Sequence, residues 1–199
     1  NLAQARKSYQ ASLTIRARLA ASGPKNAAWH RDLSVSHEKL GTVQAAQGDL
    51  DGALASFQAA VIIIKRLVAA FPDNKDEQRD LSVSHNKVGD VQRLQGDLRQ
   101  ALRSYQAGLI IARKLAAADS ANADWQRDLA VSYERVGVVL VPQGKLARAL
   151  ESFRTSLQIR KRLAATDPRN ARWQRDMSVS QDRIGDVLTG DIGRRSMRR

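Results

Sequence analysis

The sequence predicts an all-α protein built from repeated helix hairpins, and three observations support this fold class. A segment of thirteen residues occurs four times at a fixed interval, beginning at residues 29, 77, 125 and 173, without insertions. Between these segments, apolar residues recur at steps of three, four and seven, which is the spacing of one face of an α-helix. Glycine and proline stand at fixed places between the apolar stretches, where they end helices. We therefore expect a stack of small helical units.

Three markers define the repeat. The first runs from Trp29 to Gly41, and its copies occupy residues 77–89, 125–137 and 173–185. The second is an alanine followed four residues later by an aromatic residue, as in Ala5–Tyr9, Ala53–Phe57, Ala101–Tyr105 and Ala149–Phe153. The third is a proline at residues 24, 72 and 168, replaced by serine at residue 120.

Each repeat interval divides into two helices, which we call helix A and helix B. Helix A follows an asparagine suited to capping its first turn, at Asn26, Asn74 and Asn170. A glycine able to adopt a left-handed conformation then separates helix A from helix B, at Gly48, Gly96 and Gly144. Pro142 lies in the last turn of the third helix A, where it cannot donate a backbone hydrogen bond, so we expect that helix to end early or to kink.

This register gives the domain organisation. We expect one array over 1–199: helix B of a truncated repeat at 1–24, full repeats at about 25–72, 73–120 and 121–168, helix A of a truncated repeat at 169–190, and a basic tail at 191–199. Neither end carries a dedicated polar capping helix, and the first residue is not methionine. We therefore expect the chain to be part of a longer protein.

The spacing of small and aromatic residues resembles the tetratricopeptide repeat (TPR) family over essentially the whole chain. The matching positions are an aliphatic residue before glycine at 40–41, 88–89, 136–137 and 184–185, the hairpin glycines, and the alanine–aromatic pairs. The resemblance implies a right-handed α-solenoid of helix-turn-helix repeats. The interval is 48 residues rather than 34, so each helix gains about two turns and should approach 20 residues. The family's tryptophan position holds His37, His85, Tyr133 and Gln181, which places the tight core packing on the Trp29 series instead.

Composition and charge exclude several classes of protein. The chain has no cysteine, which rules out disulfides and thiolate sites and fits a cytoplasmic location. Its uninterrupted apolar runs are too short to span a bilayer, and no signal peptide is visible, so we expect no membrane insertion. The net charge of +13 suggests nucleic acid, but residues 49–144 hold 12 basic and 12 acidic side chains. The basic excess therefore lies at the two ends, and we consider nucleic acid binding a minor alternative.

No set of residues predicts catalysis, a metal site or another cofactor. His37 and His85 lie one repeat apart without a third ligand, so we interpret them as packing or surface residues. The serines at 34, 82 and 178 lack a fixed histidine partner, and no phosphate-binding loop occurs. The dipeptide Arg-Asp is identical in all four copies, at 31–32, 79–80, 127–128 and 175–176. We predict that the arginine of one repeat pairs with the aspartate of the next.

The candidate binding surface follows from the resemblance, which implies that A helices line a concave face on which peptides lie. Carried over from the glycine of each copy, the exposed positions are Val35, Glu38, Thr42, Val83, Asn86, Asp90, Arg93, Val131, Glu134, Val138, Val179, Asp182 and Asp186. They form a row of four valines flanked by acidic residues. We expect a ligand segment that is apolar with basic residues, and the alternative is that these positions are solvated helix faces without a ligand.

The sequence thus predicts a protein–protein interaction scaffold, the partner-binding arm of a larger bacterial-type protein, with no enzymatic activity and no small-molecule substrate. Two alternatives remain open. The apolar faces of the first helix B and the last helix A could stack end to end between copies, giving a self-assembling module. A basic nucleic-acid-binding repeat protein is the weaker alternative, because cations do not line one face in register with stacking aromatic residues.

Overall fold

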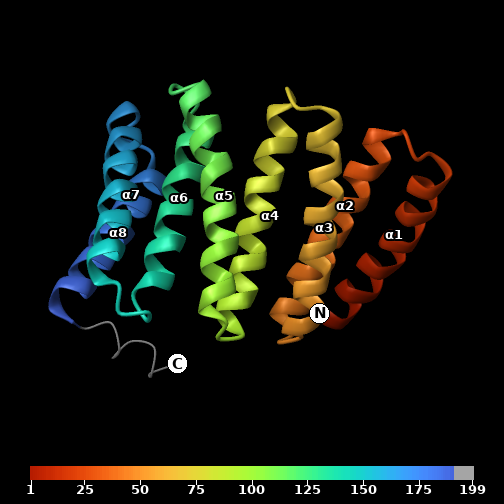
Figure 1. Ribbon diagram of the computed structural model, residues 1–199, viewed down its shortest axis with the longest axis horizontal. Helices are drawn as coiled ribbons and strands as arrows, with labels where there is room; N and C mark the ends of the chain where they lie inside the picture. Colours follow the sequence, from red (N-terminus) through yellow and green to blue (C-terminus); the bar gives the residue numbers. More distant parts are fainter. Residues whose placement is uncertain (191–199) are drawn as a thin grey trace. The chain divides into compact units, whose positions relative to one another are not determined.

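The computed structural model describes residues 1–190, and every regular element among them is an α-helix (Figure 1). The basic tail expected at 191–199 lies outside the described residues. The eight described helices are α1 (Leu2–Ser22), α2 (Ala27–Ala46), α3 (Leu50–Ala70), α4 (Lys75–Leu94), α5 (Leu98–Ala118), α6 (Ala123–Leu140), α7 (Leu146–Thr166) and α8 (Ala171–Thr189). Their lengths of 18 to 21 residues match the expected length of about 20. The all-α, helical-repeat fold class is therefore confirmed.

Capping at both helix ends follows the sequence signals. The side-chain oxygens of Asn26 and Asn170 accept hydrogen bonds from the backbone N–H groups of Trp29 and Trp173, and Asn74 and Asn122 cap α4 and α6 in the same way. These bonds satisfy amide groups that have no partner inside the helix. The hairpin glycines adopt the left-handed conformation, with φ of 80°, 83° and 71° at residues 48, 96 and 144. A side chain at these positions would be strained.

Helix α6 is shorter than α2 and α4, the two A helices that precede it in the chain. It has 18 residues, whereas α2 and α4 each have 20, and it ends at Leu140 with Val141 as its C-cap. Pro142 follows directly, and the residue before a proline disfavours the helical conformation while the proline itself offers no N–H. The early helix end predicted from Pro142 is thus confirmed.

Within the array, the chain divides into two compact units. Unit 1 comprises residues 1–104, and unit 2 begins at Tyr105, so the division falls inside α5. In unit 1, α2 packs against both α1 and α3, and α3 also packs against α4. In unit 2, α7 packs against both α6 and α8. Within each unit, successive helices are antiparallel neighbours joined by short turns (Figure 1).

The A and B helices approach each other where glycine meets an aromatic ring. A Cβ atom built at Gly41 in α2 would lie 2.9 Å from the Phe57 ring in α3, and one at Gly137 in α6 would lie 2.5 Å from the Phe153 ring in α7. Both rings are almost fully buried. Only glycine allows these contacts without displacement, as the spacing of the repeat predicts. A Cβ atom built at Gly185 in α8, the equivalent position, would have no described atom of another helix within 4 Å.

Helix α3 is the most apolar helix and lies between α2 and α4 in unit 1. Its inward side buries Phe57, Val61, Ile64 and Leu67, and Ala53 and Ala60 let the neighbouring helices approach. By length and composition alone, α3 could cross a membrane, and among residues 1–190 no other helix passes this test. The lysine–arginine pair at 65–66 interrupts the apolar run of this helix, so the uninterrupted run in the sequence is too short to span a bilayer.

Candidate functional site

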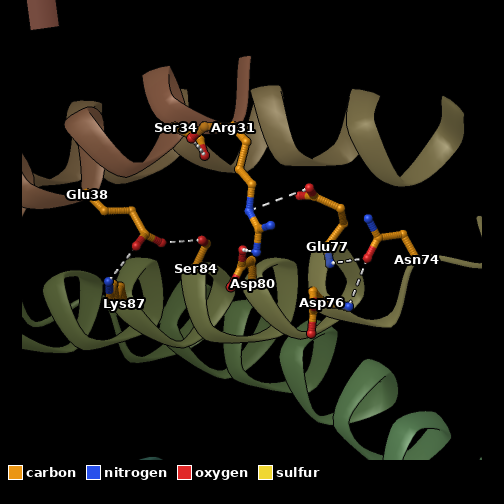
Figure 2. Close-up of polar contacts among 9 residues, drawn as sticks. All are labelled: Arg31, Ser34, Glu38, Asn74, Asp76, Glu77, Asp80, Ser84 and Lys87. Carbon is orange, nitrogen blue, oxygen red and sulfur yellow. Dashed lines mark hydrogen bonds and ion pairs between the residues drawn. The ribbon is translucent and has the colours of Figure 1, made fainter. Parts of the chain in front are cut away.

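The A helices of each unit are joined by polar side chains at the face where the binding surface was predicted. In unit 1, Arg31 of α2 reaches α4 (Figure 2). Its Nη2 donates to Oδ2 of Asp80 at 3.3 Å, and its Nε lies 3.6 Å from Oε1 of Glu77. In unit 2, Nε of Arg127 in α6 donates to Oδ2 of Asp176 in α8 at 3.0 Å. The predicted pairing of arginine with the aspartate of the next repeat is therefore confirmed at both junctions.

A second polar contact lies one to two turns further along the same helices. Glu38 of α2 contacts two residues of α4 (Figure 2). It accepts a hydrogen bond from the Ser84 hydroxyl at 2.5 Å and forms an ion pair with Nζ of Lys87 at 2.8 Å. Lys87 also lies 5.8 Å from the centre of the Phe57 ring, within the range of a cation–π contact. Glu38 is therefore held by its own chain on two sides.

Unit 2 builds the equivalent contact around a buried arginine. Arg160 of α7 is only 4% exposed, and its Nη2 donates to Oε2 of Glu134 in α6 at 2.5 Å. Its Nη1 donates to the backbone oxygen of Asp176 at 2.8 Å and to the Ser180 hydroxyl at 2.7 Å, both in α8. Arg183 of α8 lies 3.9 Å from the other carboxylate oxygen of Glu134. One guanidinium thus joins three consecutive helices.

Arg160 was not among the residues predicted for the site, although its repeat position carries a signal in the sequence. Arg16 of α1 occupies the same repeat position and bonds in the same way, with its Nη1 3.2 Å from the Asp32 backbone oxygen and 2.8 Å from the Ser36 hydroxyl. Both partners recur in every repeat, and the serine is buried in every copy, at Ser36, Ser84, Ser132 and Ser180. Both arginines follow the small residue of helix B by four positions, as Arg16 follows Ser12 and Arg160 follows Ser156. This spacing could have indicated that the arginine bonds to the buried serine of helix A.

Two carboxyl groups at the junction of α2 and α4 have pKa values raised by their surroundings. Burial raises the pKa of the Glu77 carboxyl, and Arg31 only partly offsets this effect. Glu77 is 5% exposed, and its Oε2 has no hydrogen-bond partner. Burial also raises the pKa of Asp80, again against the opposing influence of Arg31. The desolvation of both carboxylates therefore outweighs the stabilisation that they gain from the single arginine they share.

The predicted surface residues fall into four groups. Val35, Val83, Val131, Val138 and Val179 are partly exposed, as are Asp90 and Asp186, while Thr42, Arg93 and Asp182 are exposed. Glu38 and Glu134 are engaged in the contacts described above. Asn86 was expected to be exposed and is buried, at 7%.

The histidines behave as packing residues. Burial lowers the pKa of His37, and burial together with the charge of Lys65 lowers that of His85 to about 4, so both rings are neutral at pH 7. The His30 ring lies 3.1 Å from the Pro24 backbone oxygen. Among residues 1–190, no group of three or more side chains of the metal-binding types is close enough to hold an ion.

Comparison with known proteins supports the fold. No protein-family model matches the chain, and no curated protein matches its sequence. The crystal structure of BtubC (BKLC) from P. vanneervenii is similar, with a TM-score of 0.70 and 16% identity, covering 97% of this chain and 68% of that chain. The crystal structure of MamA matches with a TM-score of 0.45 and 13% identity, over 94% of this chain and 86% of that one. The designed helical repeat protein DHR64 matches with a TM-score of 0.39 and 12% identity, over the full length of both. At this identity, the likeness to BtubC shows a shared helical-repeat fold.

Proposed function

We propose that this chain is a protein-interaction scaffold, which binds an extended partner segment across the A helices of each unit. The observation that carries the proposal is the valine that recurs at the same repeat position of every A helix, at Val35, Val83, Val131 and Val179. Each of these side chains is partly exposed, although the serine beside it in the sequence is buried. An aliphatic side chain kept at one partly exposed position of a repeat suits a ligand that contacts each repeat in turn.

The charges of this face favour a ligand bound chiefly through apolar side chains. Glu38 and Glu134 each accept at least two contacts from their own chain, so little of their negative charge is available to a partner. The exposed polar positions near the valines are Thr42 and Arg93 in unit 1 and Asp182 in unit 2. We therefore propose a mainly apolar ligand whose basic residues meet unit 2 more favourably than unit 1.

A peptide selection with site-specific crosslinking tests this proposal. Peptides would be selected on the 199-residue chain from a random library, and a photoreactive amino acid would then be placed at Thr42 or at Gln58. Both positions are exposed, but Thr42 lies on helix A of the first hairpin and Gln58 on its helix B. We expect the selected peptides to crosslink from residue 42 and not from residue 58.

Substitution of the valines provides the quantitative arm. Val83→Ser and Val179→Ser should each weaken binding of a selected peptide by about tenfold, because each removes one apolar contact that the ligand covers. Gln58→Ser is the control and should leave the affinity unchanged. The proposal is wrong if no peptide is enriched, or if the enriched peptides crosslink only from residue 58.

A further inference from the structure

Contacts between successive repeats obey fixed offsets in the sequence. The arginine–aspartate pairs 31–80 and 127–176 share one offset. The pairs 38–87 and 134–183, in which a glutamate meets a lysine or arginine, have that same offset. The two close glycine–aromatic contacts share a shorter one, from 41 to 57 and from 137 to 153. The position of any group in the repeat therefore identifies the group that it should meet.

Helix α8 carries the first member of each contact, and residues 1–190 do not supply the second member. Arg175, equivalent to Arg31 and Arg127, is exposed, and so is Asp182, which is equivalent to Glu38 and Glu134. Gly185 has open space where Gly41 and Gly137 meet a phenylalanine ring, since no described atom lies within 4 Å of its Cβ position. These three groups lie on the side of α8 that corresponds to the following repeat.

Helices α1 and α2 present the opposite halves. Asp32, equivalent to Asp80 and Asp176, has an exposed side chain, as does Lys39, equivalent to Lys87 and Arg183. Tyr9 occupies the position of the two phenylalanine rings and is partly exposed. Arg16 donates to the backbone oxygen and serine hydroxyl that are equivalent in the repeat to those bound by Arg160, yet within residues 1–190 no carboxylate contacts it.

We propose that α1 and α2 of a second copy of this chain dock on α7 and α8 of the first. Helix α1 is a helix B and helix α8 is a helix A, so α1 of the second copy would pack on α8 as α3 packs on α2 and α7 on α6. Continued in this register, the offsets place Asp32 of the second copy opposite Arg175, and Lys39 and Arg16 of the second copy opposite Asp182. The same register places its Tyr9 ring over Gly185.

Charge complementarity selects a second copy as the occupant. On α8, a cation and an anion stand seven residues apart, and on α2 an anion and a cation stand seven residues apart in the reverse order. Both pairings repeat geometry seen twice inside the chain, and the glycine accepts an aromatic ring that α1 supplies. The contact is heterologous, because two different surfaces meet, so it propagates into a ring or an open chain of molecules.

Charge-swapped variants test this contact by sedimentation velocity over a concentration series. The 199-residue chain should show a weight-average mass that rises with concentration and falls with added salt. Arg175→Asp and Asp32→Arg should each weaken self-association by about tenfold, because each places like charges opposite one another. Both side chains are exposed and have no partner within residues 1–190, so the circular dichroism and the melting temperature should stay unchanged.

Two rescue experiments make the result specific. The double variant Arg175→Asp/Asp32→Arg should associate as strongly as the original chain to within about threefold, because the opposite charges are restored in swapped order. An equimolar mixture of the two single variants should also associate, because each blocked surface then meets a complementary one. Gly185→Leu should weaken self-association without lowering the melting temperature, since it fills the space meant for Tyr9.

Control substitutions come from helix α7. Arg154→Asp and Glu151→Arg make the same charge changes at two positions that are exposed in all four copies of helix B. They should leave self-association unchanged. A chain that stays monomeric up to about 1 mM, single variants that associate like the original, or a double variant no better than the singles would each overturn the proposal.

Discussion

The two units use the same repeat position in opposite ways. In unit 1, the position on helix B that faces the junction of two A helices holds Ile64, which is 2% exposed. In unit 2, it holds Arg160, which is 4% exposed and carries a positive charge. The glutamate above it is retained in both units, as Glu38 and Glu134. Unit 1 therefore closes the junction with two contacts from α4, whereas unit 2 adds a buried guanidinium from α7.

This difference shows how one backbone geometry accommodates an apolar or an ionic junction. A buried charge costs several kcal/mol in desolvation, which its partners must offset through well-aligned bonds. Arg160 achieves this offset with a carboxylate, a hydroxyl and a backbone oxygen, although its Nε has no partner. The ionic junction therefore depends on every one of its partners. In unit 1, Ile64 at the same position is apolar and needs no such partner.

The largest expected effect tests this dependence directly. Glu134→Ala removes the carboxylate from a buried arginine and should lower the free energy of unfolding by about 3 kcal/mol. Glu38→Ala, the same change at the same repeat position, should cost only about 0.5 kcal/mol, because Lys87 is 31% exposed and regains water. Urea denaturation of both variants measures the two costs, and equal costs would remove the distinction between the units.

Replacing Arg160 by isoleucine, the residue at the equivalent position Ile64, tests how much of the cost of Glu134→Ala comes from the unpaired arginine. In an Arg160→Ile background, Glu134 retains its contact with Arg183, as Glu38 retains its contact with Lys87. The cost of Glu134→Ala should then fall to about 0.5 kcal/mol, as in unit 1. A cost that stays near about 3 kcal/mol would assign the effect to the glutamate itself.

The second prediction concerns how closely the helices approach in each unit. Gly137→Ala should destabilise unit 2 by about 2 kcal/mol, since the added Cβ would lie 2.5 Å from the Phe153 ring. Gly41→Ala should cost less, about 1 kcal/mol, because its nearest ring atom lies 2.9 Å away. Gly185→Ala is the control, and it should stabilise the chain by up to about 1 kcal/mol, because alanine favours helix and nothing crowds it. Thermal melts of the three variants would contradict this picture if all three shifted in the same direction.

The fold was predictable because its signals are local and repeated. Asn26 caps the next helix with its side chain. Gly48 adopts the left-handed φ that the turn requires. Pro142 ends α6 early because it lacks an N–H group. Gly41 and Phe57 lie close in the sequence on adjacent helices, so the repeat fixes their contact. The Arg-Asp pairing was also predictable, because a single repeat interval brings equivalent positions to neighbouring helices.

The candidate site was less predictable because the exposure of a side chain depends on its nonlocal neighbours. Glu38 and Glu134 look like free acidic residues in the sequence. In the structure, each forms an ion pair with a lysine or arginine of the next A helix. The buried role of Arg160 was hidden because two intervening copies hold Ile64 and Ala112 at that position. The division at Tyr105 has no marker in the sequence, because the repeat interval continues through it without change.

The third prediction concerns pH, since all three histidines lie in unit 1. The folded-state pKa of His85 is about 4, below its ordinary value of 6.5, so the unfolded chain takes up the proton first as the pH falls. Stability is therefore complete above pH 6.5 and decreases towards pH 4. Between pH 7 and pH 5, the loss should be about 1 kcal/mol, after allowing for the partial exposure of the ring. His85→Gln, which carries the residue of position 181 in unit 2, should abolish most of this loss in urea denaturation. An unchanged loss in this variant would assign the pH dependence to other groups.

The smallest expected effect concerns Glu77, which stands where α2, α6 and α8 have tryptophan. Its raised pKa means that the folded state disfavours its charge, so Glu77→Gln should stabilise the chain at neutral pH by about 1 kcal/mol. This gain should vanish as the pH falls through the pKa of Glu77, because the protonated acid is then as neutral as the amide. Asp73→Asn, at an exposed carboxylate four residues earlier, is the control and should change stability by less than about 0.5 kcal/mol. If Glu77→Gln is instead destabilising, the pairing of Arg31 with Glu77 outweighs the cost of burial. The junction of unit 1 would then depend on its ions as the junction of unit 2 does.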